Sequence, residues 1–189
     1  GDGAGILFQT PHEFLYDECL KLGICLPEFG KYGVGMVFFP KEPRWREECR
    51  EIFQRSAEKL GLEILGYRKV PVRPDGIGET ALSVEPEIEQ VFIACPYHIS
   101  DPEIFERKLF VLRNYVSKTV RNTVPKEKSL FYIASLSYKT IVYKGQLTTY
   151  QVRHYYTDLS DEKMVSAFAL IHSRFATNTF PIWRLAHPY

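Results

Sequence analysis

The sequence predicts a single domain of mixed α and β structure. At 189 residues the chain is long enough to bury one sizeable core. Aromatic residues make up 14% of the chain, which favours β-strands and well-filled layers over a simple helical bundle. Apolar runs alternate with amphipathic segments over residues 4–120, and a hairpin pattern follows, so parallel and antiparallel strand pairing are both compatible with the sequence.

The expected strands are short apolar runs bounded by glycine, proline or turn residues. They cover residues 4–9, 32–40, 62–70, 87–96, 129–137 and 140–145, with a last strand beginning near Val165. Gly33 and Gly35 interrupt the second run, which predicts a close backbone approach or a bulge. A tight turn at Tyr138–Lys139 predicts a hairpin between two of the later strands.

Three helices are expected from apolar stripes and end signals. For the first, Thr10 is the predicted N-cap, Pro11 takes the first helical position and Glu13 closes a capping box, and Gly23 follows the helix end. The second spans 43–60, with its buried stripe at Trp45, Cys49, Ile52, Phe53 and Leu60.

The third helix covers 101–120, where Asp101 and Pro102 give an N-cap and a proline at the first helical position. Its stripe consists of Phe105, Leu109, Leu112 and Val116. Both later helices are expected to pack on one side of the strands near 62–70 and 88–95. Residues 146–159 are ambiguous and fit a short helix.

Composition argues against several classes of partner. The 24 basic and 23 acidic residues give a net charge of +1, which predicts no strong attraction to nucleic acid or to an anionic membrane. No apolar run reaches the length of a bilayer span, and the N-terminus lacks a secretory signal pattern. The four cysteines lack CxxC or zinc-site spacing, which predicts reduced thiols in a cytoplasmic protein and no structural metal.

Several local patterns do not indicate a functional site. Gly33-Val34-Gly35 and Gly76-Ile77-Gly78 lack the third glycine and the strand-to-helix setting of a dinucleotide site. His172 and Ser173 are adjacent on a predicted strand and point to opposite faces, so they do not form a hydrolase pair by themselves. The glutamates of 43–60 fit a solvated helix face, without the apolar pocket that acid–base catalysis requires.

Arg174 is the strongest candidate for a binding residue. It follows the run AFALI (167–171), predicted to be a core strand, and the guanidinium at the strand's end either reaches water or holds an anion. A carboxylate suits its planar fork bidentately. Thr177, Asn178 and Thr179 add hydroxyl and amide groups that could contact a small polar ligand. From the residues alone, an ordinary sheet-end arginine and a ligand site are equally good interpretations.

The stretch from residue 172 reads HSRFATNTFPIW and resembles a segment of the glutamine amidotransferase domain in glutamate synthase large subunits. The beginning of the chain, GDGAGI, is similar to an early strand of the same domain. Further blocks follow in the family's order, among them LPEFGKYGVGMVFFP, FYIASLSYKTIVYKG and LAHP. The wider class II amidotransferases are similar to this chain only in shorter motifs at Asp2–Ile6 and Arg174–Thr177.

The resemblance implies an α+β fold of the N-terminal-nucleophile hydrolase type, a four-layer αββα sandwich with mainly antiparallel sheets. It implies glutaminase chemistry, in which an N-terminal cysteine attacks L-glutamine and the released ammonia passes to 2-oxoglutarate. Arg174 would hold the substrate α-carboxylate, with Thr177 and Asn178 lining the pocket. The domain itself needs no cofactor; FMN, an iron–sulfur cluster and NAD(P)H or ferredoxin belong to the family's other domains, which are implied partners.

Two departures from the family pattern matter. The family's nucleophile lies upstream of GDGAGI, whereas residue 1 here is Gly1, and neither Cys19 nor Cys25 matches the nucleophile motif. The family's His-Asn-Gly segment, which supplies the oxyanion hole, follows the position of Tyr189. We therefore expect residues 1–189 to be one partial amidotransferase domain, incomplete at both ends, with no catalytic residue and no activity alone. The alternative is a non-catalytic glutamine-binding sensor or scaffold module.

Overall fold

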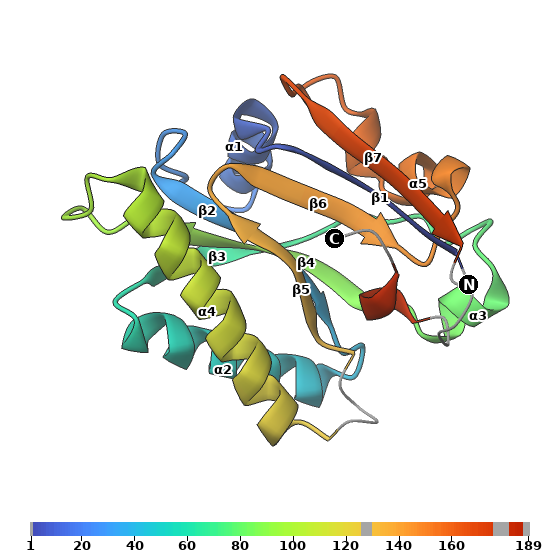
Figure 1. Ribbon diagram of the computed structural model, residues 1–189, viewed down its shortest axis with the longest axis horizontal. Coiled ribbons are helices and arrows are strands. Elements are labelled where there is room, and N and C mark those ends of the chain that lie inside the picture. The colour runs from blue at the N-terminus through green and yellow to red at the C-terminus, as the bar shows by residue number, and fades with distance from the viewer. Residues whose placement is uncertain (1, 126–129, 176–181, 187–189) are drawn as a thin grey trace.

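Two antiparallel sheets stacked face to face form the centre of the protein (Figure 1). The computed structural model describes residues 2–125, 130–175 and 182–186. The first sheet has the strand order β6-β1-β7, with β6 at Thr140–Gly145, β1 at Asp2–Gln9 and β7 at Ala169–Phe175. The second has the order β3-β4-β2-β5, with β3 at Glu63–Lys69, β4 at Glu87–Ala94, β2 at Tyr32–Phe39 and β5 at Tyr132–Ser137.

Every strand pair in these two sheets is antiparallel. The sequence had left parallel and antiparallel pairing both open. The glycine pair in β2 marks close packing, as predicted. A Cβ placed on Gly33 would lie 2.5 Å from Leu109 Cδ1, and one on Gly35 would lie 2.7 Å from Val91 Cγ1. The ladder between β2 and β5 also shifts register between Met36 and Val37.

The predicted hairpin at Tyr138–Lys139 is wrong in one respect. The turn exists, but β5 and β6 on its two sides belong to different sheets and are not paired. Side chains take the backbone amides instead: Ser137 Oγ accepts from Lys139 N at 2.9 Å, and Ser135 Oγ accepts from Val142 N at 3.1 Å. The chain therefore crosses from one sheet to the other at this turn.

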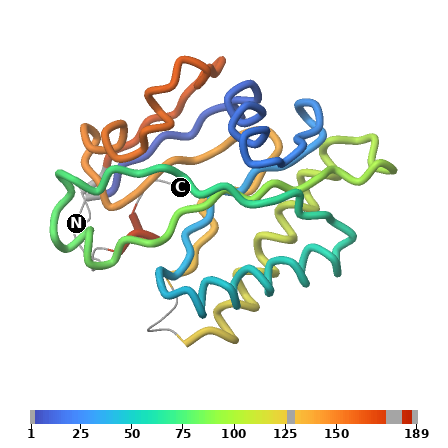
Figure 2. The backbone as a smooth tube through the Cα atoms, turned by 180° about the vertical axis from the view of Figure 1, so that it is seen from behind, coloured from blue at the N-terminus to red at the C-terminus, as the bar shows by residue number. Residues whose placement is uncertain are grey.

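Helices flank the sheets on more than one side (Figures 1 and 2). They are α1 (His12–Lys21), α2 (Pro43–Lys59), α3 (Glu79–Ser83), α4 (Pro102–Thr123) and α5 (Thr149–Tyr155), with 3-10 turns η1 (Thr157–Ser160) and η2 (Trp183–Leu185). The short α3 was not expected from the sequence. The ambiguous segment does form a short helix, α5, as the sequence allowed.

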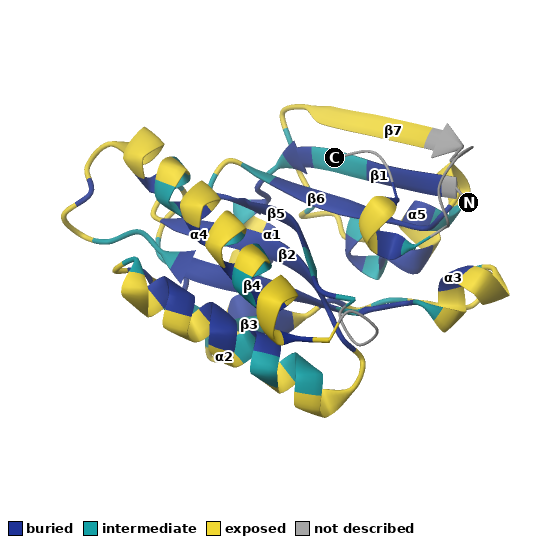
Figure 3. Cartoon of the chain, turned by 60° about the horizontal axis from the view of Figure 1, so that its bottom comes forward, coloured by how far each residue is buried: buried dark blue, intermediate teal, exposed yellow. Residues whose placement is uncertain are grey.

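The two long helices behave as predicted. Asp101 caps α4 by accepting from Glu103 N at 2.9 Å, and Gly61 follows α2 with a φ of 66°, a left-handed conformation that glycine adopts without steric cost. Both helices cover the same face of the four-stranded sheet and share one apolar core with it (Figure 3). This core contains Phe53 from α2, Leu109 from α4 and Val91 from β4, all fully buried.

The start of α1 differs from the prediction. The helix begins at His12, after Pro11 as its N-cap residue, and no side chain caps it. Thr10 is buried and is used elsewhere, since its Oγ1 donates to the Tyr138 carbonyl at 3.2 Å and its backbone N donates to the Lys139 carbonyl at 2.9 Å. A tertiary contact with the sheet-crossing turn has replaced the local capping box.

A buried ionic network joins the two sheets. Arg68 of β3 is 3% exposed and donates to both carboxylate oxygens of Asp158, at 2.8 and 2.9 Å, and to Glu18 at 2.9 Å. Tyr143 of β6 donates to the same Asp158 at 2.9 Å and accepts from Gln90 of β4. Burial opposes the charge on Arg68, but the hydrogen bonds and charge of Asp158, together with the hydrogen bond to Glu18, outweigh it and raise the arginine's pKa.

The last strand also departs from the sequence-based expectation. β7 begins at Ala169, later than the expected start near Val165, and it lies at the edge of its sheet. Leu170 and Ile171 are 57% and 69% exposed, and Figure 3 shows the strand as exposed beside the buried β1 and β6. The prediction that AFALI is a core strand is therefore wrong for the described structure. No helix among the described residues is long and apolar enough to cross a membrane.

We expect Phe53→Ala and Leu109→Ala each to lower the free energy of unfolding by about 2–5 kcal/mol, because each truncation leaves a cavity in a filled core. Val111→Ala on α4 is the control, since this side chain is 48% exposed. Denaturant titration of the three variants measures the effect. Unfolding curves for the two core variants that coincide with the control would show that the helix faces are assigned incorrectly.

Candidate functional site

The pairing of β1 with β7 brings the two motifs of the sequence together. In this antiparallel ladder Gly3 lies opposite Arg174, Ala4 opposite Ser173 and Gly5 opposite His172. The expectation that the first strand and the HSRF strand share one layer is confirmed. The motifs are more than 160 positions apart in the sequence, so this register, and not chain proximity, creates the candidate site.

Gly5 separates two basic residues across the sheet. Its partner on β6 is Lys144, and its partner on β7 is His172, so the three occupy one row of the sheet. Directly opposed residues project from the same face. A Cβ on Gly5 would lie 2.7 Å from Lys144 Cβ and 2.8 Å from the Tyr143 carbonyl oxygen. The row therefore requires glycine at its centre, because β6 approaches β1 too closely for any side chain there.

Lys144 is the unusual ionisable group of this row. It is 1% exposed, and its Nζ lies 4.6 Å from the ring centre of Tyr132, an attractive cation–π distance. Burial, and then the positive charge of Arg113, lower the pKa of its ammonium group to about 8. An amine with such a pKa exchanges its proton near neutral pH. A charged residue within the apolar strand TIVYKG was the sequence signal for it, and our sequence reasoning missed it.

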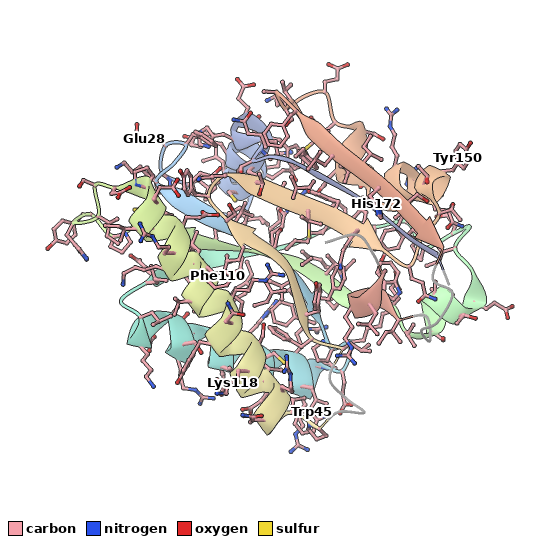
Figure 4. The ribbon with its side chains drawn as sticks, viewed as in Figure 1. Glu28, Trp45, Phe110, Lys118, Tyr150 and His172 are labelled. Carbon is pink, nitrogen blue, oxygen red and sulfur yellow. The ribbon has the colours of Figure 1, made fainter. Side chains whose placement is uncertain are left out.

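A cavity of about 420 Å³ lies along the same pair of strands. It falls within the volume range of small-molecule sites. Ala4, Ile6 and Phe8 of β1 form one wall, and α5 and β7 contribute Val152, Arg153, Ile171 and His172. Most of these groups are apolar, with Arg153 and His172 as the ionisable ones. Figure 4 labels His172 on β7, beside β1.

The structure places the predicted site residues only in part. Arg174 lies in β7 opposite Gly3, and the position of its backbone agrees with the prediction. Its side chain, together with Thr177 and Asn178, lies outside what the structure describes. Their roles in ligand binding therefore remain predictions.

Two of the four cysteines, Cys19 and Cys49, are fully buried free thiols. Burial raises the pKa of both Cys19 and Cys49 to about 12, so each is a protonated thiol at neutral pH. Burial also raises the pKa of Cys95, which is partly buried. Cys25 is exposed in the loop between α1 and β2. None of the four lines the cavity along β1 and β7 in the described part of the chain.

A second buried polar group lies beyond the candidate site. Glu85 accepts from Tyr155 Oη at 2.6 Å and from Lys41 Nζ at 2.6 Å, and it anchors the segment around α3 to α5. Burial raises the pKa of Tyr155, and its neighbour Tyr156 and its bond to Glu85 add to the effect. Among the residues that the structure describes, no group of three His, Cys, Asp or Glu side chains is arranged to hold a metal ion.

We expect Lys144→Met to change how stability depends on pH. The folded-state pKa of about 8 lies below the usual 10.5, so between these values the unfolded chain holds more protons than the folded one. The free energy of unfolding of the wild type, relative to the variant, should therefore rise by about 2 kcal/mol from pH 7 to pH 9.5. Urea titrations across this range measure it.

The control for this prediction is Lys118→Met, because Lys118 is an exposed lysine on α4. Its pH dependence should run parallel to that of the wild type. Parallel curves for Lys144→Met as well would show that the buried amine does not titrate in this range.

A known protein family matches the chain over its whole length. The family model described as "Glutamine amidotransferases class-II" matches residues 1–189. The glutamate synthase [NADPH] large chain of Bacillus subtilis is 48% identical over 188 residues, covering 100% of this chain and 12% of that protein.

Two further relatives agree. Glutamate synthase [NADH] of Schizosaccharomyces pombe is 46% identical over 193 residues, and ferredoxin-dependent glutamate synthase 2 of Synechocystis is 37% identical over 188 residues. Each match covers 100% of this chain, but only 9% and 12% of those two proteins. The chain thus spans about a tenth of the length of the curated relatives it matches.

The fold prediction is confirmed by the two stacked antiparallel sheets with helices packed against them, since class-II amidotransferases have the N-terminal-nucleophile hydrolase fold. The resemblance of HSRFATNTFPIW and GDGAGI to that family is likewise confirmed by a match that extends from the first residue to the last. The chain belongs to the class-II glutamine amidotransferase family.

Proposed function

We propose that residues 1–189 form a single glutamine amidotransferase domain of a glutamate synthase and contribute the glutamine-binding part of its site. The observation that carries this proposal is the β1–β7 register, which sets Arg174 opposite Gly3. The full-length similarity to glutamate synthases supports it. The substrate is L-glutamine, and the parent protein transfers its ammonia to 2-oxoglutarate.

In this proposal Arg174 binds the α-carboxylate of glutamine through both of its terminal nitrogens. A bidentate guanidinium fixes the orientation of a carboxylate as well as its charge. Thr177 and Asn178 complete the wall of the pocket with hydroxyl and amide groups. Gly3, the partner of Arg174 in the ladder, supports the assignment, because a glycine lets a ligand approach the backbone of β1 closely.

The nucleophile of the proposed reaction is an N-terminal cysteine of the parent protein, which is none of the four cysteines of this chain. It attacks the side-chain amide of glutamine and expels ammonia, and water then cleaves the γ-glutamyl thioester. The chemistry of FMN, the iron–sulfur cluster and NAD(P)H or ferredoxin belongs, in this proposal, to other domains of the parent protein. We also propose a cytoplasmic location, which free cysteines suit.

We expect Arg174→Lys in the full-length parent protein to raise the KM for glutamine by about tenfold or more, since a charged, bidentate hydrogen bond of roughly 1.5–3 kcal/mol is lost. Lysine keeps the charge but not the planar fork. Steady-state glutaminase kinetics measure the change, and circular dichroism checks the fold.

The matched control for this variant is Arg55→Lys, whose side chain is 64% exposed on α2. It should leave KM unchanged. An unchanged KM in Arg174→Lys would remove the arginine from the glutamine site.

We also expect residues 1–189 alone to release no ammonia from glutamine above a buffer control. Cys19 and Cys49 are buried with a pKa of about 12, and a protonated thiol is a poor nucleophile. A coupled ammonia assay tests this, with the full-length protein as the positive control. Turnover by residues 1–189 that is lost in Cys19→Ala or Cys25→Ala would contradict the proposed division of roles.

The same assay separates the enzyme from its alternative. A full-length protein that binds glutamine but releases no ammonia would indicate a sensor or scaffold module instead of an amidotransferase.

A further inference from the structure

The outward face of α4 combines positive charge with exposed apolar side chains. The helix carries five basic and two acidic residues, a net charge of +3, in a chain whose net charge is only +1. Ile104, Phe110, Val111 and Tyr115 are 46%, 63%, 48% and 37% exposed on the same helix. Figure 3 shows this exposed face, and Figure 4 labels Phe110 and Lys118 on it.

The two acidic residues of α4 already have partners within the chain. Glu103 pairs with Lys139 at 2.5 Å, and Glu106 accepts from Ser137 Oγ at 2.5 Å. They are therefore occupied at the end of the helix nearest the sheet-crossing turn. Among the residues that the structure describes, Arg113, Lys118 and Arg121 farther along α4 form no ion pair.

A groove of about 720 Å³ runs between α4, β5 and η2. Arg113 and Arg121 of α4 and Arg184 of η2 line it, with Phe110 and Tyr132 as aromatic neighbours. No aspartate or glutamate is among the described lining residues. Within the described ranges none of the three arginines forms an ion pair, and Arg113 makes one long hydrogen bond, to the Ala134 carbonyl at 3.5 Å.

The groove also adds to the charge that Lys144 experiences. The positive charge of Arg113 lowers the pKa of the Lys144 ammonium group, which means that the two cations lie close enough to repel each other. Repulsion between like charges destabilises the folded state. A carboxylate placed in the groove would relieve this repulsion.

The composition of the surface decides which kind of anion fits. Arginine and aromatic residues are enriched at protein–protein interfaces, and aspartate and glutamate are depleted there. A small anion would use the arginines but would leave Val111, Ile104 and Tyr115 exposed to water. A second copy of this chain fits poorly, because two α4 faces of charge +3 would repel.

We propose that the outward face of α4, together with Arg184 of η2, binds a carboxylate-bearing apolar segment of the parent polypeptide that lies outside residues 1–189. This inference rests on the proposed function, in which the chain is one domain of a larger synthase. The relatives support a large surrounding protein, since the chain covers only 9–12% of their length. Carboxylates of the segment pair with the arginines, and its apolar side chains cover Phe110 and Val111.

Zero-length cross-linking of the full-length parent protein tests the proposal. Arg121→Lys and Arg184→Lys keep the charge and supply an amine, which a carbodiimide couples to any carboxylate in contact with it. Mass spectrometry of the digested protein should show that each variant gains a cross-link to an aspartate or glutamate outside residues 1–189. The control is Arg55→Lys on α2, where Glu48 and Glu51 are the nearest carboxylates, so its links should stay inside this chain.

Gained links only to residues of this chain, or none at all, would overturn the proposal, provided that the variants fold by circular dichroism. A second arm adds pyrophosphate as a small polyanion probe. If pyrophosphate raises the Tm of the wild type but not that of Arg121→Gln/Arg184→Gln, and no outside link forms, the groove is a small-anion site and the proposal is wrong. Glutaminase activity of the same preparations is measured separately, so that a missing link with full activity overturns only the docking surface.

Discussion

The pairing of Arg68 with Asp158 is the interaction on which the arrangement of the two sheets depends. An arginine at 3% exposure is tolerated because its two terminal nitrogens make four hydrogen bonds, two to Asp158, one to Glu18 and one to Gln90. Removing one partner from such a site leaves an uncompensated buried charge. The network therefore fixes η1 against β3, and with it the start of the segment that returns to β7. An ion pair between Lys163 and Asp17 holds the same segment to α1.

Electrostatics also connects the candidate site to the α4 face. Lys144 lies in the row with Gly5 and His172. Burial, and then the positive charge of Arg113 on α4, lower the pKa of the Lys144 amine. If a carboxylate neutralises Arg113, the cost of charging Lys144 falls and its pKa rises. Docking of a neighbouring segment and the protonation state of Lys144 in the candidate site would then be linked through these two side chains.

The sequence predicted the parts of the fold that are decided locally. The helices at 43–60 and 101–120 follow from apolar stripes, and their ends follow from Asp101 and Gly61. The capping box at Thr10 failed because the distant Tyr138 carbonyl accepts from the Thr10 hydroxyl. The hairpin at Tyr138–Lys139 failed because the Ser137 and Ser135 side chains accept from backbone amides of the following segment. The charge of Arg68 in its strand gives no sign of a partner 90 positions away, so the pair with Asp158 was missed. Lys144 was missed although its charge stands out in an apolar strand. For the site, resemblance supplied the two motifs, and the β1–β7 register supplied their juxtaposition, which periodicity alone does not give.

The placement of β1 has a consequence for how the chain folds. Its ladders join Phe8 to Ile141 on one side and Ile6 to Ile171 on the other, while the four-stranded sheet draws its strands from the continuous region between residues 32 and 137. Loop closure over more than 130 residues is entropically costly before any contact rewards it. Strand β1 therefore stays without either sheet partner until the strands at residues 140–145 and 169–175 have formed. The candidate site, built on that strand, is therefore assembled later than the four-stranded sheet.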